Sequence, residues 1–271
     1  MQLLTSDYLL GFGFRWLHIL VGIAWIGLLY YFNLVQVPGL AAYGDEGKAR
    51  NITITQIATR ALWWFRWASV ATLATGLIIA GVVPDYMKQI IAEITRLARR
   101  SPDVNQRSGV SVRASIADYE AMIANATRRA IRLNDRVAVP RVSDLAFVLP
   151  SLQGKVELET VEEGKDEQIL DRLVQGAVAA TFNRLIGDAD MDVVVDAFRS
   201  GRSVETGEVK NAGEYQRLLQ DIDGLAEAVG EITRDERPQV QASAIEFVLE
   251  GLHLNKRLNK DRVSGRALYR G

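Results

Sequence analysis

The chain has 271 residues, of which 48% are hydrophobic, and its 32 Lys and Arg against 33 Asp and Glu give a net charge of −1. It has no cysteine and only two histidines, which excludes a disulfide framework, a cysteine-based metal site and a multi-histidine zinc or copper site within one chain. The mildly acidic balance, with no dense Lys/Arg cluster, argues against a nucleic-acid-binding face.

The averages over the whole chain do not show that the sequence changes at Pro84 from mostly apolar to frequently charged. Two apolar runs, at about 17–37 and 62–83, are the only long ones, and the second is interrupted by a single Arg66. Each approaches the roughly 20 residues that a helix needs to cross a bilayer. Pro38 and Gly39 are expected to end the first run, and the polar residues 44–47 predict a turn. The N-terminus is not basic, unlike a cleaved signal peptide.

We therefore expect residues 1–83 to form a two-span transmembrane hairpin in the inner (cytoplasmic) membrane. Residues 84–271 should form a soluble domain, with a candidate subdivision near 187–211. Basic residues that closely follow the second run favour a cytoplasmic position for this domain. The expected fold class is all-α.

His18 lies inside the first apolar run. An ionisable side chain within a membrane is a functional candidate by default, here as a haem ligand or a proton carrier. The alternative is an interfacial histidine that hydrogen-bonds a neighbouring carbonyl, and no second histidine lies nearby for bis-histidine ligation.

The two apolar runs resemble a known family. RWLHILVGIAWIGLLYYFNLVQVPGL (15–40) and ALWWFRWASVATLATGL (61–77) are similar to the opening of the membrane-bound urate oxidase (urate hydroxylase) family. That family has further spans, and many members end in a cytochrome c domain. Both are missing here, so the resemblance implies at most an N-terminal fragment of a urate-oxidising membrane protein.

From Pro84 onward the sequence has the periodicity of amphipathic helices. We expect helices over 85–100, 112–134, 167–186, 193–198, 212–233 and 238–259, with little or no sheet. Ser111 is the expected N-cap of the second helix, whose inward face should carry Ile116, Tyr119, Ile123 and Ala126. Residues 142–149 are a short apolar piece, 155–161 alternate briefly like a strand, and a turn-rich linker follows 193–198.

No catalytic motif is present. The phosphate-binding pattern G-x-x-x-x-G-K-[ST] is absent, because Lys48 is followed by Ala49 and Lys155 by Val156. Neither a nucleophile elbow nor G-x-G-x-x-G occurs. We therefore expect no catalytic residue, no metal site and no enzymatic activity of the chain on its own.

The second part resembles the AAA+ ATPases related to magnesium chelatase subunit I. The resemblance lies in VVPDYMKQIIAEITRLARRSPDVNQRSGVSVRASIADYE (82–120), AVPRVSDLAFVLPSLQGKVELE (138–159) and EFVLEGLHLNKRLNK (246–260). In that family this region forms the helical lid after the ATPase core. The resemblance implies that Arg113 is a nucleotide-sensing (sensor-2) arginine. The alternative is a surface arginine paired with Asp118 or Glu120.

The sequence thus predicts a membrane-tethered AAA+ lid-type module without its own ATPase core, acting as an interaction or regulatory piece. ATP and magnesium are expected only in trans with a complete AAA+ partner, self-association is a second mode of contact, and haem is not expected. Two alternatives remain: the urate-oxidising fragment, and a fusion of two truncated genes with no evolved joint function.

Overall fold

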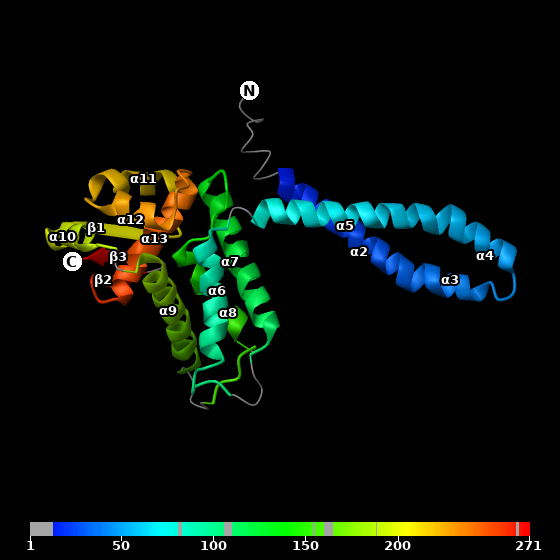
Figure 1. Ribbon diagram of the computed structural model, residues 1–271, viewed down its shortest axis with the longest axis horizontal. Helices are drawn as coiled ribbons and strands as arrows, with labels where there is room; N and C mark the ends of the chain where they lie inside the picture. Colours follow the sequence, from blue (N-terminus) through cyan, green and yellow to red (C-terminus); the bar gives the residue numbers. More distant parts are fainter. Residues whose placement is uncertain are drawn as a thin grey trace, which may run out of the picture. The chain divides into compact units, whose positions relative to one another are not determined.

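A computed structural model of the chain describes residues 13–80, 83–105, 110–153, 155–159, 165–187, 189–263 and 266–271. The chain divides into two compact units, Met1–Val82 and Val83–Gly271 (Figure 1). This division lies one residue from the predicted domain boundary.

The first unit is a pair of long helices. α2 (Phe14–Tyr30) continues through a π-helical turn (Tyr31–Gln36) into α3 (Val37–Ala42). After a turn at Gly44, whose φ is +50°, α4 (Gly47–Thr53) continues through a second π-helical turn (Ile54–Ala58) into α5 (Thr59–Ala80). α2 and α5 pack side by side.

Pro38 does not end the first helix, contrary to the prediction. Proline lacks an N–H and its ring clashes with the carbonyl four residues earlier, which normally breaks a helix. Here the preceding π-helical turn carries wider hydrogen bonds, and the Val37 N–H reaches the carbonyl of Phe32. This local widening lets the helix continue past Pro38 to Ala42.

In the described part of the chain, one helix, Trp16–Ala42, is long and apolar enough to cross a membrane, and it lies near the N-terminus. None of its apolar window is buried. The second predicted span, 62–83, includes residues 81–82, which lie outside the described ranges, and it stays a prediction.

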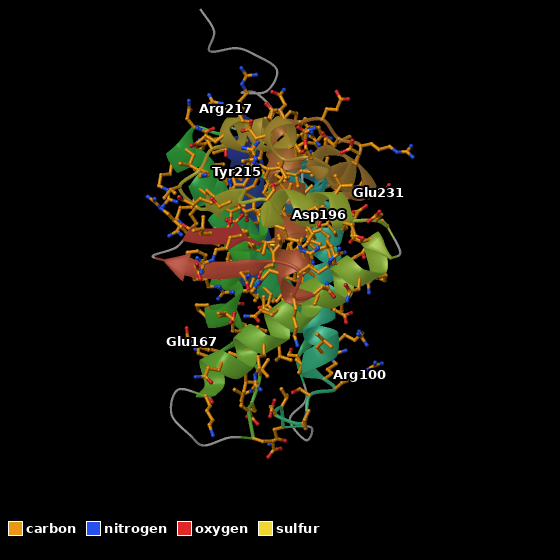
Figure 2. The ribbon with its side chains drawn as sticks, turned by 90° about the vertical axis from the view of Figure 1, so that its left-hand side faces the viewer. Arg100, Glu167, Asp196, Tyr215, Arg217 and Glu231 are labelled. Atoms are coloured by element: carbon orange, nitrogen blue, oxygen red, sulfur yellow. The ribbon has the colours of Figure 1, made fainter. Side chains whose placement is uncertain are left out.

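The second unit is mostly helical, as predicted. Its helices are α6 (Asp85–Ala98), α7 (Val112–Leu133), a 3₁₀ helix (Val142–Val148), α8 (Leu149–Leu152), α9 (Lys165–Ile186), α10 (Asp192–Arg199), α11 (Ala212–Asp221), α12 (Leu225–Ile232) and α13 (Pro238–Leu254). α6 packs against both α7 and α9, and α13 packs against α9, α11 and α12. Charged side chains cover the outside of the unit, with Arg100 and Glu167 toward one end and Arg217 toward the other (Figure 2).

A small sheet that the sequence analysis did not predict joins the end of the chain to its middle. β1 (Ser203–Gly207), β2 (Asn259–Val263) and β3 (Arg266–Arg270) form an antiparallel sheet in the order β1-β3-β2. Thr206 lies opposite Ala267 in this register. β1 occupies part of the predicted linker, and β2 begins where the last predicted helix was expected to end.

Two helix boundaries also differ from the prediction. The expected helix 212–233 is two helices, because Gly224 adopts φ +77° between them, a left-handed conformation that favours glycine. A Cβ at this position would lie 2.9 Å from Val193 Cγ1. The helix expected at 238–259 ends at Leu254.

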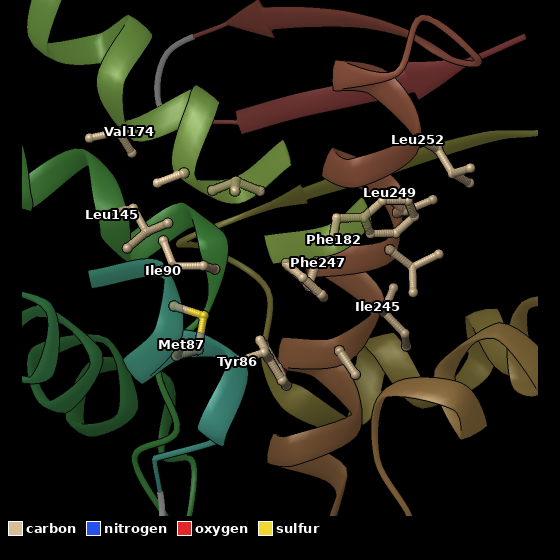
Figure 3. Packing of buried hydrophobic residues seen from close by; sticks show 14 of the residues in the cluster. Tyr86, Met87, Ile90, Leu145, Val174, Phe182, Ile245, Phe247, Leu249 and Leu252 are labelled. Atoms are coloured by element: carbon tan, nitrogen blue, oxygen red, sulfur yellow. The ribbon is translucent and has the colours of Figure 1, made fainter. Parts of the chain in front are cut away.

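One hydrophobic cluster runs through the second unit, from α6 to β3 and across 187–211. Its centre is α13, where Phe247 stacks on Tyr86 with ring centroids 4.7 Å apart and meets Phe182 edge-on at 5.7 Å (Figure 3). Gly251 lets α9 approach, because a Cβ there would lie 2.1 Å from the Phe182 ring.

The inward face of α7 is largely the predicted one. Ala126 is buried, and Tyr119 and Ile123 pack against the core, whereas Ile116 is 55% exposed. The buried positions also include three polar residues, Asp118, Asn125 and Arg129, which apolar periodicity could not select.

Candidate functional site

The predicted site residue Arg113 lies in the first turn of α7. Ser111 is the N-cap, as predicted, and its hydroxyl oxygen accepts a hydrogen bond from the Arg113 N–H at 3.2 Å. Such a cap is typical of a helix start. The Arg113 side chain is exposed. It therefore stands at the positive end of a 22-residue helix, where the Arg113 and Ala114 N–H groups are bound by Ser111.

The end of α6 brings further positive charge to this helix start. The Arg99 guanidinium donates to the carbonyl of Val110 at 3.2 Å, and the hydroxyls of Thr95 and Ser115 lie 2.6 Å apart. These contacts hold the C-terminus of α6 against the N-terminus of α7. Exposed Arg100 lies on the same end of α6. An anion at this surface would meet guanidinium groups at the positive end of the helix dipole.

Neither acidic neighbour neutralises Arg113. Asp118 is fully buried, while Arg113 and Glu120 are exposed, and no ion pair joins Arg113 to either carboxylate among the residues that the structure describes. The surface-pairing alternative therefore does not match the geometry. Burial raises the pKa of Asp118 to about 6, because it removes water from the charged carboxylate, and the nearby Ser151 hydroxyl and Lys155 charge oppose this rise.

His18 makes a contact between the two helices of the first unit. Its Nδ1 lies 2.8 Å from the Thr75 hydroxyl, which donates its own hydrogen to the carbonyl of Ala71 at 2.7 Å. Gly76 leaves space for the ring, since a Cβ there would lie 3.3 Å from His18 Cε1. The bond resembles the structural alternative, with a hydroxyl of the neighbouring helix in place of a carbonyl.

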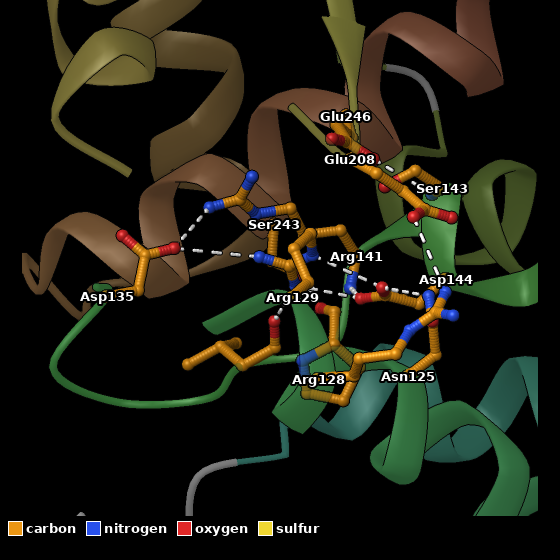
Figure 4. Close-up of polar contacts among 12 residues, drawn as sticks. Asn125, Arg128, Arg129, Asp135, Arg141, Ser143, Asp144, Glu208, Ser243 and Glu246 are labelled. Atoms are coloured by element: carbon orange, nitrogen blue, oxygen red, sulfur yellow. Dashed lines mark hydrogen bonds and ion pairs between the residues drawn. The ribbon is translucent and has the colours of Figure 1, made fainter. Parts of the chain in front are cut away.

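A buried polar network, which sequence reasoning missed, lies beside α7 (Figure 4). Arg129 binds both oxygens of Asp144 and lies 3.7 Å from Asp135. Arg141 lies 3.2 Å from Asp135 and donates to the carbonyl of Lys210 at 2.8 Å. The ion pairs join residues within 129–144, and the Arg141–Lys210 hydrogen bond joins this segment to one far along the chain. The network is structural, and its only sequence signal is the charged spacing of Arg129, Asp135, Arg141 and Asp144.

Glu246 extends the network to α13. One carboxylate oxygen accepts the Ser143 N–H at 2.9 Å, and the other accepts the Tyr215 hydroxyl at 2.5 Å. Burial raises the pKa of Tyr215 well above its usual value, and the charge of Glu246 adds to this. Within the described ranges, no group of three or more His, Cys, Asp or Glu side chains is arranged to hold a metal ion.

Comparison with known protein families, with curated proteins and with solved structures finds no match to this chain.

Proposed function

We propose that the chain is a membrane-tethered helical module of the AAA+ lid kind that offers Arg113 to a nucleotide held by another subunit. One observation carries the proposal: the Arg113 side chain is exposed at the capped start of α7 and is not neutralised by its acidic neighbours. An arginine in this position is free to bind phosphate oxygens and to stabilise charge that builds up during phosphoryl transfer.

The nucleotide must be held in trans. A phosphate-binding loop, its lysine and a magnesium-binding Ser or Thr are missing from the sequence. One arginine without that cradle does not position a triphosphate and a magnesium ion for hydrolysis. The module is therefore not an enzyme by itself and acts on a complete AAA+ partner.

The first unit serves as the membrane tether, as a two-span hairpin in the inner membrane with the second unit in the cytoplasm. The outward side chains of both helices support this proposal. Besides Trp16–Ala42, α5 exposes large apolar residues that water would not favour: Leu62, Trp63, Trp64, Trp67, Val70 and Leu73. The tryptophans suit the headgroup layer of a bilayer.

Photo-crosslinking tests the trans arrangement. A benzophenone amino acid in place of Ile116, which is exposed one turn after Arg113, should capture an ATPase subunit in native membranes. Non-hydrolysable ATP should increase the yield, and Arg113→Ala should remove that increase. Arg217→Ala, an exposed arginine near the other end of the unit, is the matched control and should leave the increase intact. A yield that responds to neither nucleotide nor Arg113→Ala contradicts the proposal.

ATP turnover tests the absence of catalysis. The full chain in lipid nanodiscs should turn over no more ATP than empty nanodiscs do. Steady turnover by the purified chain would show that it carries its own nucleotide site and would end the proposal.

The two alternatives have less structural support. The contact of His18 with Thr75 accounts for the histidine without haem, so it does not favour a urate-oxidising fragment. A haem Soret band that is lost on His18→Ala would instead favour the urate-oxidising fragment. The fusion alternative is tested by resequencing the locus across 81–83.

A further inference from the structure

The second unit contains a cavity that none of the functions above uses. It lies between the 3₁₀ helix 142–148, α9, α13 and the sheet, and its volume is about 220 Å³. This is far more than the roughly 10–15 Å³ that one water needs, and it is smaller than a typical drug-sized site of about 300–1,000 Å³. The cavity therefore has room for a compact ligand.

Three polar residues that line the cavity each have an atom without a protein partner within the described ranges. Thr206 is 3% exposed, and its hydroxyl makes no hydrogen bond within the described ranges. The Ser143 hydroxyl is buried and also has no partner. Glu250 accepts hydrogen bonds from Lys260 (2.5 Å) and from the Tyr269 hydroxyl on Oε2, which leaves Oε1 free. Buried polar groups are normally satisfied, so the unpaired Ser143 hydroxyl indicates a polar ligand, and the accessible Thr206 Oγ1 and Glu250 Oε1 can add contacts to it.

The charges around the cavity determine what kind of polar group fits. Three of the carboxylates that line the cavity have a paired cation: Glu208 pairs with Arg132, Asp171 with Arg262 and Glu250 with Lys260. The remaining lining cation, Arg266, pairs with Glu205 outside the cavity. The fourth lining carboxylate, buried Glu246, accepts hydrogen bonds but forms no ion pair within the described ranges. One negative charge at the cavity is therefore without a paired cation. Burial alone would raise the pKa of Glu250, but Lys260 and Tyr269 hold it below its ordinary value, so this carboxylate is ionised. A buried excess charge is costly unless a counter-ion balances it.

Aliphatic side chains also line the cavity: Val142, Leu145, Leu149, Val174 and Val178. The site thus combines carboxylates and hydroxyls with aliphatic groups. Figure 4 shows Ser143, Glu208 and Glu246 close together beside α13.

We propose that this cavity binds a small organic cation with a primary ammonium head and an aliphatic body. The three N–H bonds of the ammonium match Glu250 Oε1 and the Thr206 and Ser143 hydroxyls, and its charge balances the carboxylate that has no paired cation. The same chemistry occurs in a free alkylamine and in a lysine side chain of a peptide. The inference does not depend on the nucleotide proposal, because no lining residue belongs to the α7 start.

Ligand-observed NMR on the full chain in lipid nanodiscs tests the inference. n-Butylammonium should bind saturably with a dissociation constant in the millimolar range or tighter, while n-butanol and butyrate should bind at least ten-fold more weakly. Empty nanodiscs correct for partitioning into lipid. N-acetyl-lysine-N-methylamide identifies the source of the ammonium group. Tighter binding of this lysine derivative than of n-butylammonium indicates a lysine side chain of a peptide, and weaker binding indicates a free alkylamine. Both outcomes support the proposal. Absence of saturable n-butylammonium binding, or equal binding of n-butanol, overturns it.

Two variants separate ligand binding from a structural role. Thr206→Val and Ser143→Ala remove hydroxyls that have no partner, so both should leave the melting temperature of the free protein unchanged or higher. Both should weaken n-butylammonium binding at least five-fold. Ser200→Ala, an exposed serine outside the cavity, is the control and should bind like the wild type. Unchanged affinity in both cavity variants would overturn the assignment.

Discussion

Arg129 and Asp144 form a two-point ion pair, with Nη2–Oδ2 at 2.8 Å and Nε–Oδ1 at 3.2 Å, and neither side chain is more than 1% exposed. The pair holds α7 against the 3₁₀ helix 142–148, and Asn125 completes it with a 2.7 Å hydrogen bond to Asp144. Burial alone would lower the pKa of Arg129, but the charge of Asp144 raises it, so the arginine stays charged.

Removal of one partner of this ion pair should therefore strongly lower the free energy of unfolding. Arg129→Met leaves Asp144 as a buried carboxylate without its cation, which typically costs about 3–5 kcal/mol of unfolding free energy. The measurement is denaturant unfolding of the full chain in nanodiscs, followed through the second unit. Arg132→Met, a half-exposed arginine one turn later on the same helix, should cost less than about 1 kcal/mol. Equal losses in the two variants would contradict the buried role.

Asp118 should make stability depend on pH. Its pKa is about 6 in the folded chain against 3.8 ordinarily, so the folded state holds the proton more tightly than the unfolded state. The carboxyl therefore destabilises the fold as pH rises from about 4 to 6, and the loss amounts to roughly 2–3 kcal/mol. Asp118→Asn should remove this dependence, as measured by unfolding free energies at pH 4, 5, 6 and 7.

The control for Asp118 is Glu120→Gln, an exposed carboxylate two residues later on α7. It should retain the wild-type slope between pH 4 and 6. A wild-type profile that is flat in this interval would show that Asp118 is solvated.

Gly251 should not tolerate a methyl group. The Cβ of Gly251→Ala would overlap the Phe182 ring, and overpacking of this kind costs about 1–3 kcal/mol, more than the helix propensity of alanine returns. Gly230→Ala, on α12 with open space around it, should instead raise stability by up to about 1 kcal/mol. Thermal melting shows whether each substitution raises or lowers the stability of the fold. A higher melting temperature for Gly251→Ala would refute the close approach of α9 and α13.

The His18–Thr75 bond should contribute modestly to pairing of the first two long helices. Thr75→Val removes the hydroxyl that hydrogen-bonds His18 Nδ1 and should cost about 0.5–1.5 kcal/mol in a bilayer, as interhelical hydrogen bonds do. SDS titration of the reconstituted chain measures it. Thr72→Val is the control, because that hydroxyl donates only to Ala68 of its own helix and should cost less.

Much of the helical content could be predicted, because an apolar stripe at three- and four-residue spacing identifies a helix from the local sequence alone. Residues 85–98 and 165–186 have such stripes, and Ser111 carries a recognisable cap. The sheet could not be predicted, because β1 and β3 lie about 60 residues apart and each is too short to be stable without its neighbour.

The candidate functional residues likewise include some that the sequence indicates and some that it does not. Arg113 was found from its resemblance to a known motif, and its capped position followed from Ser111. The cavity could not be predicted from the sequence, because Ser143, Thr206 and Glu250 come from three separate elements and none of them belongs to a motif.

By itself, the order of amino acids determined where the chain changes from apolar to charged, which segments are helical and that a phosphate cradle is missing. Those properties depend on composition and on spacings of three or four residues. Only the tertiary structure decided that α7 buries Asp118 and Arg129, that the predicted linker pairs with the chain end, and that hydroxyls meet a carboxylate without a paired cation. Such pairings depend on contacts between segments distant in sequence, which no local pattern records.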